Sequence, residues 1–354
     1  MKRLFNVLVI LLIALCVFGC TSRRPQTQEQ TELQTRTQAH GQTHTQAQIQ
    51  RQGQTEIHEI PVQLSAPENN IPVVYMTTSI TPEGLLAVYN ALGLRANGRV
   101  AVKISTGEPG NPHFLSPTLI KDLVQLVNGT IVECNTAYGG RRANTAAHYQ
   151  VARDHGFAAI AAVVIMDERS EISIPVTGGK HLRENFVGAR FNEFNFHVVL
   201  SHFKGHQMGG FGGALKNLSI GYASSAGKAW IHSGGKSKTN PWGGAQNDFL
   251  ESMAEAAKSV IDANSGRMLY INVMNHLSVD CDCNGRPTAP TMDDIGILAS
   301  LDPVALDKAC VDLVYAARDG ADLVQRIESR NGLLTIDHAQ RIGIGSKTYR
   351  LIRL

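Results

Sequence analysis

Short apolar runs alternate with amphipathic helical patterns from residue 71 onward. Runs of this length and polarity predict buried strands. Because strands that alternate with helices favour βαβ units, we expect an α/β fold: a mostly parallel sheet with helices on both faces, in one large domain over residues 71–354. The seven apolar runs lie at 73–78, 99–105, 130–136, 161–167, 196–203, 268–274 and 295–300.

Three of the predicted helices share a start signal, a residue with a side-chain oxygen followed by proline. The pairs are Thr81-Pro82, Ser116-Pro117 and Asp302-Pro303. The oxygen can cap the first free amides, and proline at the first helical position has no N–H to leave unpaired. Segment 204–247 departs from this alternation because it is rich in Gly, Ser, Asn and Lys. It predicts a long functional loop or a small subdomain.

The first 70 residues follow a different pattern. Residues 1–19 combine a short positive start with an apolar stretch, and Gly19-Cys20 resembles a bacterial lipoprotein cleavage site. They predict a signal peptide that is removed before Cys20 is lipidated, the alternative being an uncleaved N-terminal anchor. The Gln/Thr-rich residues 20–70 predict a disordered tether, since they hold almost no large apolar side chains. We therefore expect a protein of the cell envelope, anchored by lipid at the outer membrane or the extracytoplasmic face, with no other membrane contact.

Composition narrows the classes of function. The 354 residues include 43% apolar and 18% charged side chains, which suits a sizeable folded core. With 33 Lys and Arg against 30 Asp and Glu, the net charge of +3 argues against a strongly basic nucleic-acid binder, and we expect no nucleic-acid partner. The segment GGKS at 234–237 lacks the first glycine of a phosphate-binding loop, because Trp230 stands there.

A first cluster of chemically capable residues lies at 201–221, directly after an apolar strand. Alternation along an extended chain would place its two histidines and first lysine on one face. Its glycines would let backbone amides approach a ligand closely. The cluster predicts a site for a carboxylate or phosphate, or for a metal held by imidazole; the alternative is a solvated loop with ordinary surface cations. We assign catalysis to Lys204 and His206, and ligand binding to His202, Gly212, Gly213, Lys216 and Asn217.

A second cluster follows the apolar run 268–274. Cys281 and Cys283 form a C-x-C motif, and thiolates are soft ligands for transition metals and iron–sulfur clusters. We predict a metal site at Cys281, Cys283 and His206. The alternatives are a disulfide from either cysteine to another cysteine, as persists outside the cytoplasm, or plain buried thiols. For Cys134 and Cys310 simple burial is the better interpretation.

A third cluster is the segment 102–117. Lys103 stands at a strand end and is a candidate catalytic residue, although it could equally be a lysine whose stem covers apolar surface. His113 lies in a Gly/Pro loop that leads into a predicted helix N-terminus, a position that attracts anions. We therefore count His113 as a candidate for ligand binding.

Five strings in order along the chain resemble the domain-of-unknown-function family numbered 362, whose members are often described as iron–sulfur-centre proteins. The strings are VKISTGEPGNPHFLSP, ECNTAYGGRR, SHFKGHQMGGFGGALKNLSIG, CDC and DIGILASLDPVALDKACVDLV, and the resemblance spans roughly residues 72–350. Residues carried over by this resemblance are Lys204, His206, Lys216, Asn217, Cys281, Cys283, Asp294, Asp302, Asp307 and Cys310. Asp302 is also explained as a helix cap, and Cys310 as part of the core.

These observations lead to a working hypothesis of metal- or iron–sulfur-dependent redox chemistry on a small anionic molecule. The expected cofactor is an iron–sulfur cluster or a transition metal. Two alternatives come from other classes: a non-catalytic lipoprotein that binds an anion, and a cofactor-dependent isomerase or racemase of a small acid, in which Lys and His act as acid and base.

Overall fold

The computed structural model describes residues 71–354. The predicted signal peptide, Cys20 and the tether lie outside the described residues. Within the described part of the chain, no helix combines the length and the apolar character needed to cross a membrane.

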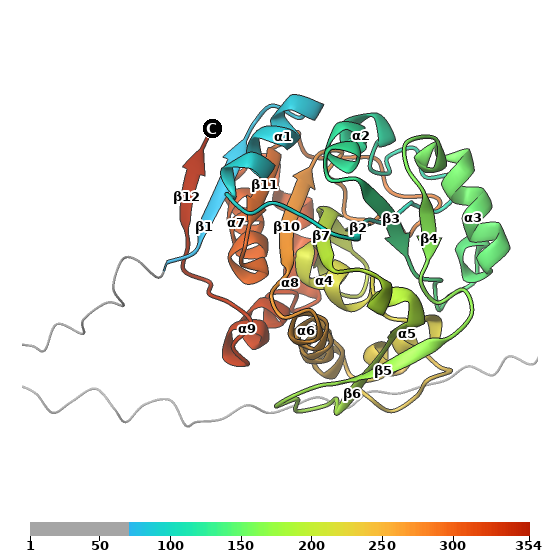
Figure 1. Cartoon of the computed structure of the whole chain (residues 1–354). Helices are drawn as coiled ribbons and strands as arrows, with labels where there is room; N and C mark the ends of the chain where they lie inside the picture. The colour runs from blue at the N-terminus through green and yellow to red at the C-terminus, as the bar shows by residue number, and fades with distance from the viewer. Residues whose placement is uncertain (1–70) are drawn as a thin grey trace, which may run out of the picture. The chain divides into compact units, whose positions relative to one another are not determined.

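An eight-stranded sheet in the order β12-β1-β11-β10-β7-β2-β3-β4 forms the centre of the described chain (Figure 1). Strand β11 runs antiparallel to both of its neighbours, whereas the other pairings are parallel. All seven predicted runs form strands of this sheet, so the mostly parallel α/β fold is confirmed. The strands are β1 (Val73–Thr77), β2 (Val100–Lys103), β3 (Gly129–Glu133), β4 (Val163–Ile165), β7 (Phe196–His202), β10 (Met268–Met274), β11 (Gly296–Ser300) and β12 (Arg350–Arg353).

Helices cover both faces of the sheet, as the alternation predicts. The α-helices are α1 (Pro82–Ala91), α2 (Pro117–Leu126), α3 (Thr145–Asp154), α4 (Ala214–Ser219), α5 (Ser225–His232), α6 (Gln246–Ala263), α7 (Pro303–Ala316), α8 (Ala321–Ser329) and α9 (Leu333–Arg341). Side chains along β2 alternate between the two faces: Val100 and Val102 pack into one apolar core with α1 and α2, while Ala101 packs into the other with α4, α7 and α9. Short 3-10 turns are η2 (Arg141–Ala143), η3 (Phe157–Ala159) and η4 (Ala189–Glu193).

Two of the three predicted helix caps are confirmed. Thr81 Oγ1 accepts the Gly84 amide at 3.1 Å, and Asp302 accepts two amides at the start of α7. The third prediction is wrong in one respect. Helix α2 begins at Pro117, but Ser116 caps no amide, because its hydroxyl instead lies 2.7 Å from Thr118 Oγ1.

The segment 204–247 is not a long loop. It contains β8 (Lys204–His206) paired with β9 (Gly210–Gly212), then α4 and α5 and the start of α6. Phe211, Leu215 and Leu218 of this segment are buried in the same core as one face of the sheet. Ile231 packs in a smaller core with α6. Local sequence hides this because the first amides of α4 have no local cap: the carboxylate of Asp307, on α7, accepts the Ala214 amide at 2.7 Å and the Leu215 amide at 2.9 Å. A separate hairpin joins β5 (Glu171–Pro175) to β6 (Glu184–Gly188).

Candidate functional site

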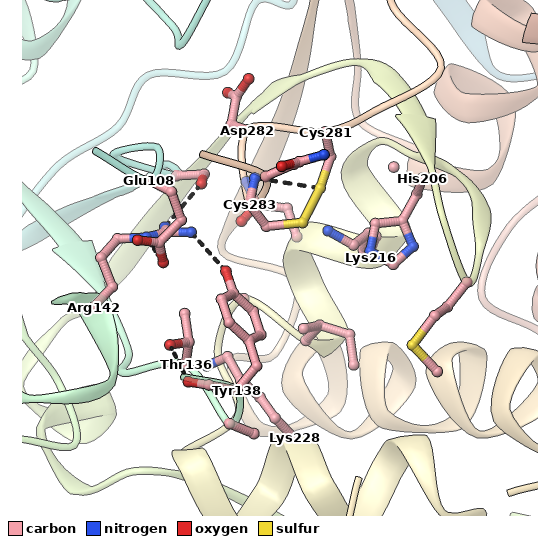
Figure 2. Close-up of a pocket in the computed structure, with 18 of the residues that line it drawn as sticks. Glu108, Thr136, Tyr138, Arg142, His206, Lys216, Lys228, Cys281, Asp282 and Cys283 are labelled. Atoms are coloured by element: carbon pink, nitrogen blue, oxygen red, sulfur yellow. Dashed lines mark hydrogen bonds and ion pairs between the residues drawn. A yellow bond between two sulfur atoms is a disulfide. The ribbon is translucent and has the colours of Figure 1, made fainter. Parts of the chain in front are cut away.

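A cavity of about 550 Å³ lies at the carboxyl ends of the parallel strands. Its wall comes from segments that follow four of them: 103–109 after β2, 133–142 after β3, 201–207 after β7 and 281–285 after β10. Helix α4 supplies a further part of the wall. Open α/β sheets bind ligands at this edge, where loops from neighbouring strands converge. The three clusters identified in the sequence therefore meet at one place in the fold (Figure 2).

The C-x-C motif and His206 come together at this cavity. One ligand atom from each of Cys281, Cys283 and His206 lies within 4.8 Å of the other two. Cys281 and Cys283 are joined to each other by a disulfide, which corrects the expectation that a bridge would lead to another cysteine. Cys134 and Cys310 are free and buried, as predicted.

Hydrogen bonding determines which nitrogen of His206 carries its proton. The Gly209 amide donates to Nδ1 at 2.8 Å, so the proton of the neutral ring lies on Nε2. Burial, together with the positive charge of Lys216, holds the pKa of His206 well below its ordinary value. The ring is therefore neutral at physiological pH, which is the form that can ligate a metal.

The donor set fits one metal ion in the reduced state of the cysteines. Two thiolates and an imidazole suit a soft or borderline ion, whereas the disulfide has no thiolate to offer. An iron–sulfur cluster takes four protein ligands, more than these three residues supply. The free cysteines, Cys134 and Cys310, do not belong to the group.

Lys103 and Asn217 form a pair at the floor of the cavity. The Lys103 ammonium donates to Asn217 Oδ1 at 3.0 Å and to the Ile104 carbonyl at 2.6 Å. The Asn217 amide in turn donates to the Lys103 carbonyl and to Ser201 Oγ, both at 3.1 Å. Asn217 thereby fixes the ends of β2 and β7 relative to each other, and its amide hydrogens are already used. Burial lowers the pKa of Lys103 to about 8.

Two further lysines line the cavity. Lys216, on α4, is half-buried, and no hydrogen bond or ion pair within residues 71–354 engages its ammonium. Burial and the nearby charge of Arg142 lower the pKa of Lys216 to about 8. Lys228, on α5, is 6% exposed, and its ammonium donates to the Ala223 carbonyl at 2.6 Å. Lys228 was not predicted from the sequence. The one feature that could have indicated it is a cation within the largely apolar stretch SAGKAWIH.

Lys204 lies behind the cavity wall. Its ammonium pairs with Asp282 at 3.1 Å and donates to the His113 carbonyl at 2.6 Å. His202 Nδ1 lies 2.9 Å from the same carboxylate. Burial raises the pKa of Asp282, but these two partners more than offset it and hold that pKa at about 2.

The expected single row of His202, Lys204 and His206 does not form, because β7 ends at His202 and a new strand begins at Lys204. Lys204 and His113 are not among the lining residues.

Arg142 organises the opposite wall and was not singled out from the sequence. Its guanidinium lies 3.0 Å from Glu108 and 3.2 Å from Glu133, and it donates to the Tyr138 hydroxyl at 3.0 Å. Arg142 is 2% exposed. Arg142 belongs to the string ECNTAYGGRR. The family resemblance therefore included this segment but assigned no role to Arg142. His148 Nε2 contacts the other oxygen of Glu133 at 2.9 Å.

The two glycines before α4 line the cavity, and close packing leaves no room for a side chain at either position. A Cβ on Gly213 would lie 2.3 Å from Asp307 Oδ1, and one on Gly212 would lie 2.9 Å from Lys216 Cδ. The amides of Ala214 and Leu215, at the start of α4, are bound by Asp307. Asp307 does not engage the amides of the two glycines, so ligand binding by this loop stays a prediction. Asp307 also accepts the Asn272 side chain at 2.8 Å.

The remaining residues of the resemblance have structural partners. Asp302 caps α7 and Cys310 is buried in the core, which confirms the structural explanation given for each. Asp294 accepts the His276 amide at 2.7 Å.

Comparisons with known proteins place the chain in a family. No curated protein matches the sequence. Among solved structures, the lactate racemase apoprotein from Thermoanaerobacterium thermosaccharolyticum is 16% identical with a TM-score of 0.34, the match covering 59% of this chain and 52% of that one. A protein from Thermotoga maritima is 12% identical with a TM-score of 0.37, covering 73% of this chain and 58% of that one. The chain thus spans little more than half the length of either. The family described as Domain of unknown function (DUF362) matches residues 100–312, and the chain belongs to this family.

Proposed function

We propose that the domain binds a small anionic molecule in the cavity and acts on it with a single soft metal ion held by Cys281, Cys283 and His206. The observation that carries this proposal is the position of these three residues in the wall of a cavity that three lysines also line. The two groups of residues have different ligands. Thiolates and imidazole suit a metal, whereas buried ammonium groups need an anion.

The lysines supply the anion-binding half of the site. Lys103, Lys216 and Lys228 each place an ammonium group in the wall, and Asn217 holds Lys103 in position. The low exposure of Lys103 and Lys228 limits competition from water, which strengthens their attraction for a charged ligand.

The cysteine pair supplies the second half, and its oxidation state decides what it can do. Reduction of the disulfide consumes two electrons and two protons, which a dithiol donor provides, and leaves two thiols that ionise on metal binding. A metal at this site would supply a Lewis acid or a redox centre beside the bound anion.

Metal uptake by the purified full chain tests the proposal. The protein is reduced with a phosphine or oxidised with diamide, incubated anaerobically with Zn²⁺, desalted and analysed for zinc. We expect about one equivalent in the reduced protein and far less in the oxidised protein, as for a site that needs thiolates. Cys283→Ser should lower uptake, whereas Cys310→Ala, at a buried thiol outside the group, should not. Equal uptake by reduced and oxidised protein would contradict the proposal.

A second candidate is proton transfer on a small acid, which the position of Lys103 favours. A buried amine with a pKa of about 8 at the cavity floor can act as a base near neutral pH. Incubation with small 2-hydroxy acids in D₂O should then replace the hydrogen beside the carboxylate, as seen by ¹H NMR. Lys103→Met should abolish the exchange, and the absence of exchange with the wild type counts against this candidate.

We also propose that Cys20 carries the lipid that anchors the protein in the cell envelope. The apolar stretch that ends at Gly19-Cys20 supports this location. The bridge between Cys281 and Cys283 agrees with it, because disulfides persist outside the cytoplasm.

A further inference from the structure

The carboxylates of the cavity wall already have cationic partners. Glu108 and Glu133 share the guanidinium of Arg142 at 3.0 and 3.2 Å. Asp282 pairs with Lys204 at 3.1 Å and with His202 at 2.9 Å. All three carboxylates are buried. Within residues 71–354 none of the three forms an ion pair with a lysine of the cavity.

The three cavity lysines, in contrast, form no hydrogen bond to a charged group of the described chain. Lys103 donates to a carbonyl and to the Asn217 side chain, and Lys228 donates to a carbonyl. Lys216 has no hydrogen-bond partner within residues 71–354. Within this range none of the three lies in an ion pair. Buried ammonium groups without a counter-charge are costly, so such a cluster is stabilised by an anion that enters the cavity.

The number of unpaired cations indicates the size of the missing counter-charge. Within residues 71–354 the wall holds three ammonium groups that lie in no ion pair, whereas each wall carboxylate already lies in one. The carboxylates of Glu133 and Asp282 act on these lysines only at longer range. A ligand with two negative charges can contact more than one of the three ammonium groups.

We propose that the ligand is a small dianion, either a phosphate-type group or a dicarboxylate, bound between Lys103, Lys216 and Lys228. This inference rests on the proposed function and specifies the chemical class of its anion. A cavity of about 550 Å³ accommodates a small organic molecule that carries two negative charges. A monoanion would bring a single negative charge to the three unpaired ammonium groups.

The chain contains a reporter for binding at this site. Trp242 lines the cavity and is 58% exposed, and the one other tryptophan is Trp230. Trp230→Phe therefore leaves Trp242 as the sole source of tryptophan fluorescence. Isothermal calorimetry gives a second measurement that does not depend on fluorescence.

The experiment titrates the full chain with malonate, inorganic phosphate and acetate at pH 7.5 and constant ionic strength. We expect malonate, phosphate or both to bind at least about 10-fold more tightly than acetate, since a second charge gains a second charged contact. Phosphate and malonate serve as separate arms, and whichever binds more tightly identifies the type of dianion. Equal binding of acetate and both dianions, or no binding of either dianion at millimolar concentration, would overturn the inference.

Matched lysine variants test the position of the site. Lys216→Met keeps the aliphatic stem and should weaken dianion binding about 10- to 100-fold, the loss of one charged hydrogen bond. Lys228→Met should act in the same direction and covers the case in which the first variant fails to fold. Lys121→Met, at an exposed position on α2, is the control. If Lys216→Met and Lys228→Met bind as tightly as this control, the inference is wrong.

A double variant, Cys281→Ser with Cys283→Ser, separates this inference from the proposed function. Dianion binding that survives in the double variant supports the inference whatever the metal experiment shows. Metal uptake by a wild-type protein that discriminates no dianion would sustain the metal site and overturn the inference.

Discussion

Asp307 provides a direct test of how the fold positions the lysine-bearing helix α4. Its carboxylate is fully buried and accepts three hydrogen bonds, from the amides of Ala214 and Leu215 and from the side chain of Asn272. Burial raises the pKa of Asp307 from 3.8 to about 6, because the three hydrogen bonds offset only part of the cost of burying the charge. The folded protein therefore keeps this proton at pH values where the unfolded chain has lost it.

The direction and size of the pH effect follow from that shift. Between about pH 4 and pH 6 the folded state binds more protons than the unfolded state, so the free energy of unfolding falls as pH rises. A shift of about two pKa units at 1.36 kcal/mol per unit corresponds to about 3 kcal/mol. Asp307→Asn is nearly isosteric and does not titrate, so it removes this dependence.

Urea unfolding of the wild type and Asp307→Asn at pH 4, 5, 6 and 7 measures the effect. The stability of the wild type relative to the variant should fall by about 2.5 kcal/mol from pH 4 to pH 7, slightly less than the full effect because the unfolded carboxyl still binds some proton at pH 4. Any cost of placing an amide against the Leu215 N–H is independent of pH and cancels from this trend. A difference that stays constant, or that grows with pH, would refute the reasoning.

Three further substitutions test separate parts of the account. Arg142→Met leaves two buried carboxylates without their shared cation and should lower the free energy of unfolding by about 3–5 kcal/mol, measured by chemical denaturation; a loss under about 1 kcal/mol would show that the network is not needed. Gly213→Ala should lower the melting temperature more than Gly212→Ala, because the first Cβ meets the Asp307 carboxylate and the second meets only a flexible lysine stem; equal effects would contradict the close approach. Cys20→Ser should abolish incorporation of labelled palmitate, and a wild type that incorporates none would disprove the lipid anchor.

The sheet was predictable from the sequence, because each of its central strands is a short apolar run. The edge strand β12 was missed since it is half-exposed and reads Arg-Leu-Ile-Arg. Helix α4 was hidden for a different reason: its amides are capped by Asp307, 93 residues away from Ala214 in the chain. Local patterns cannot reveal a cap supplied by another element.

The candidate site was predictable in its chemistry and less so in its geometry. The residue types indicated Cys281, Cys283, His206 and Lys216, which do line one cavity. The position predicted for Lys204 from strand periodicity was wrong. A strand break follows His202, and the side chain of Lys204 pairs with Asp282. Arg142 and Lys228 went unassigned since their importance comes from burial, which one sequence does not display.

The combined site is tested most directly by a crystal structure of the reduced full chain soaked with Cd²⁺ and malonate. Anomalous scattering locates the cadmium without assumptions about its ligands. The account predicts cadmium bound by the sulfur atoms of Cys281 and Cys283 and by a ring nitrogen of His206, with malonate in contact with Lys216. Cadmium bound elsewhere, with both sulfur atoms reduced and unligated, would contradict it.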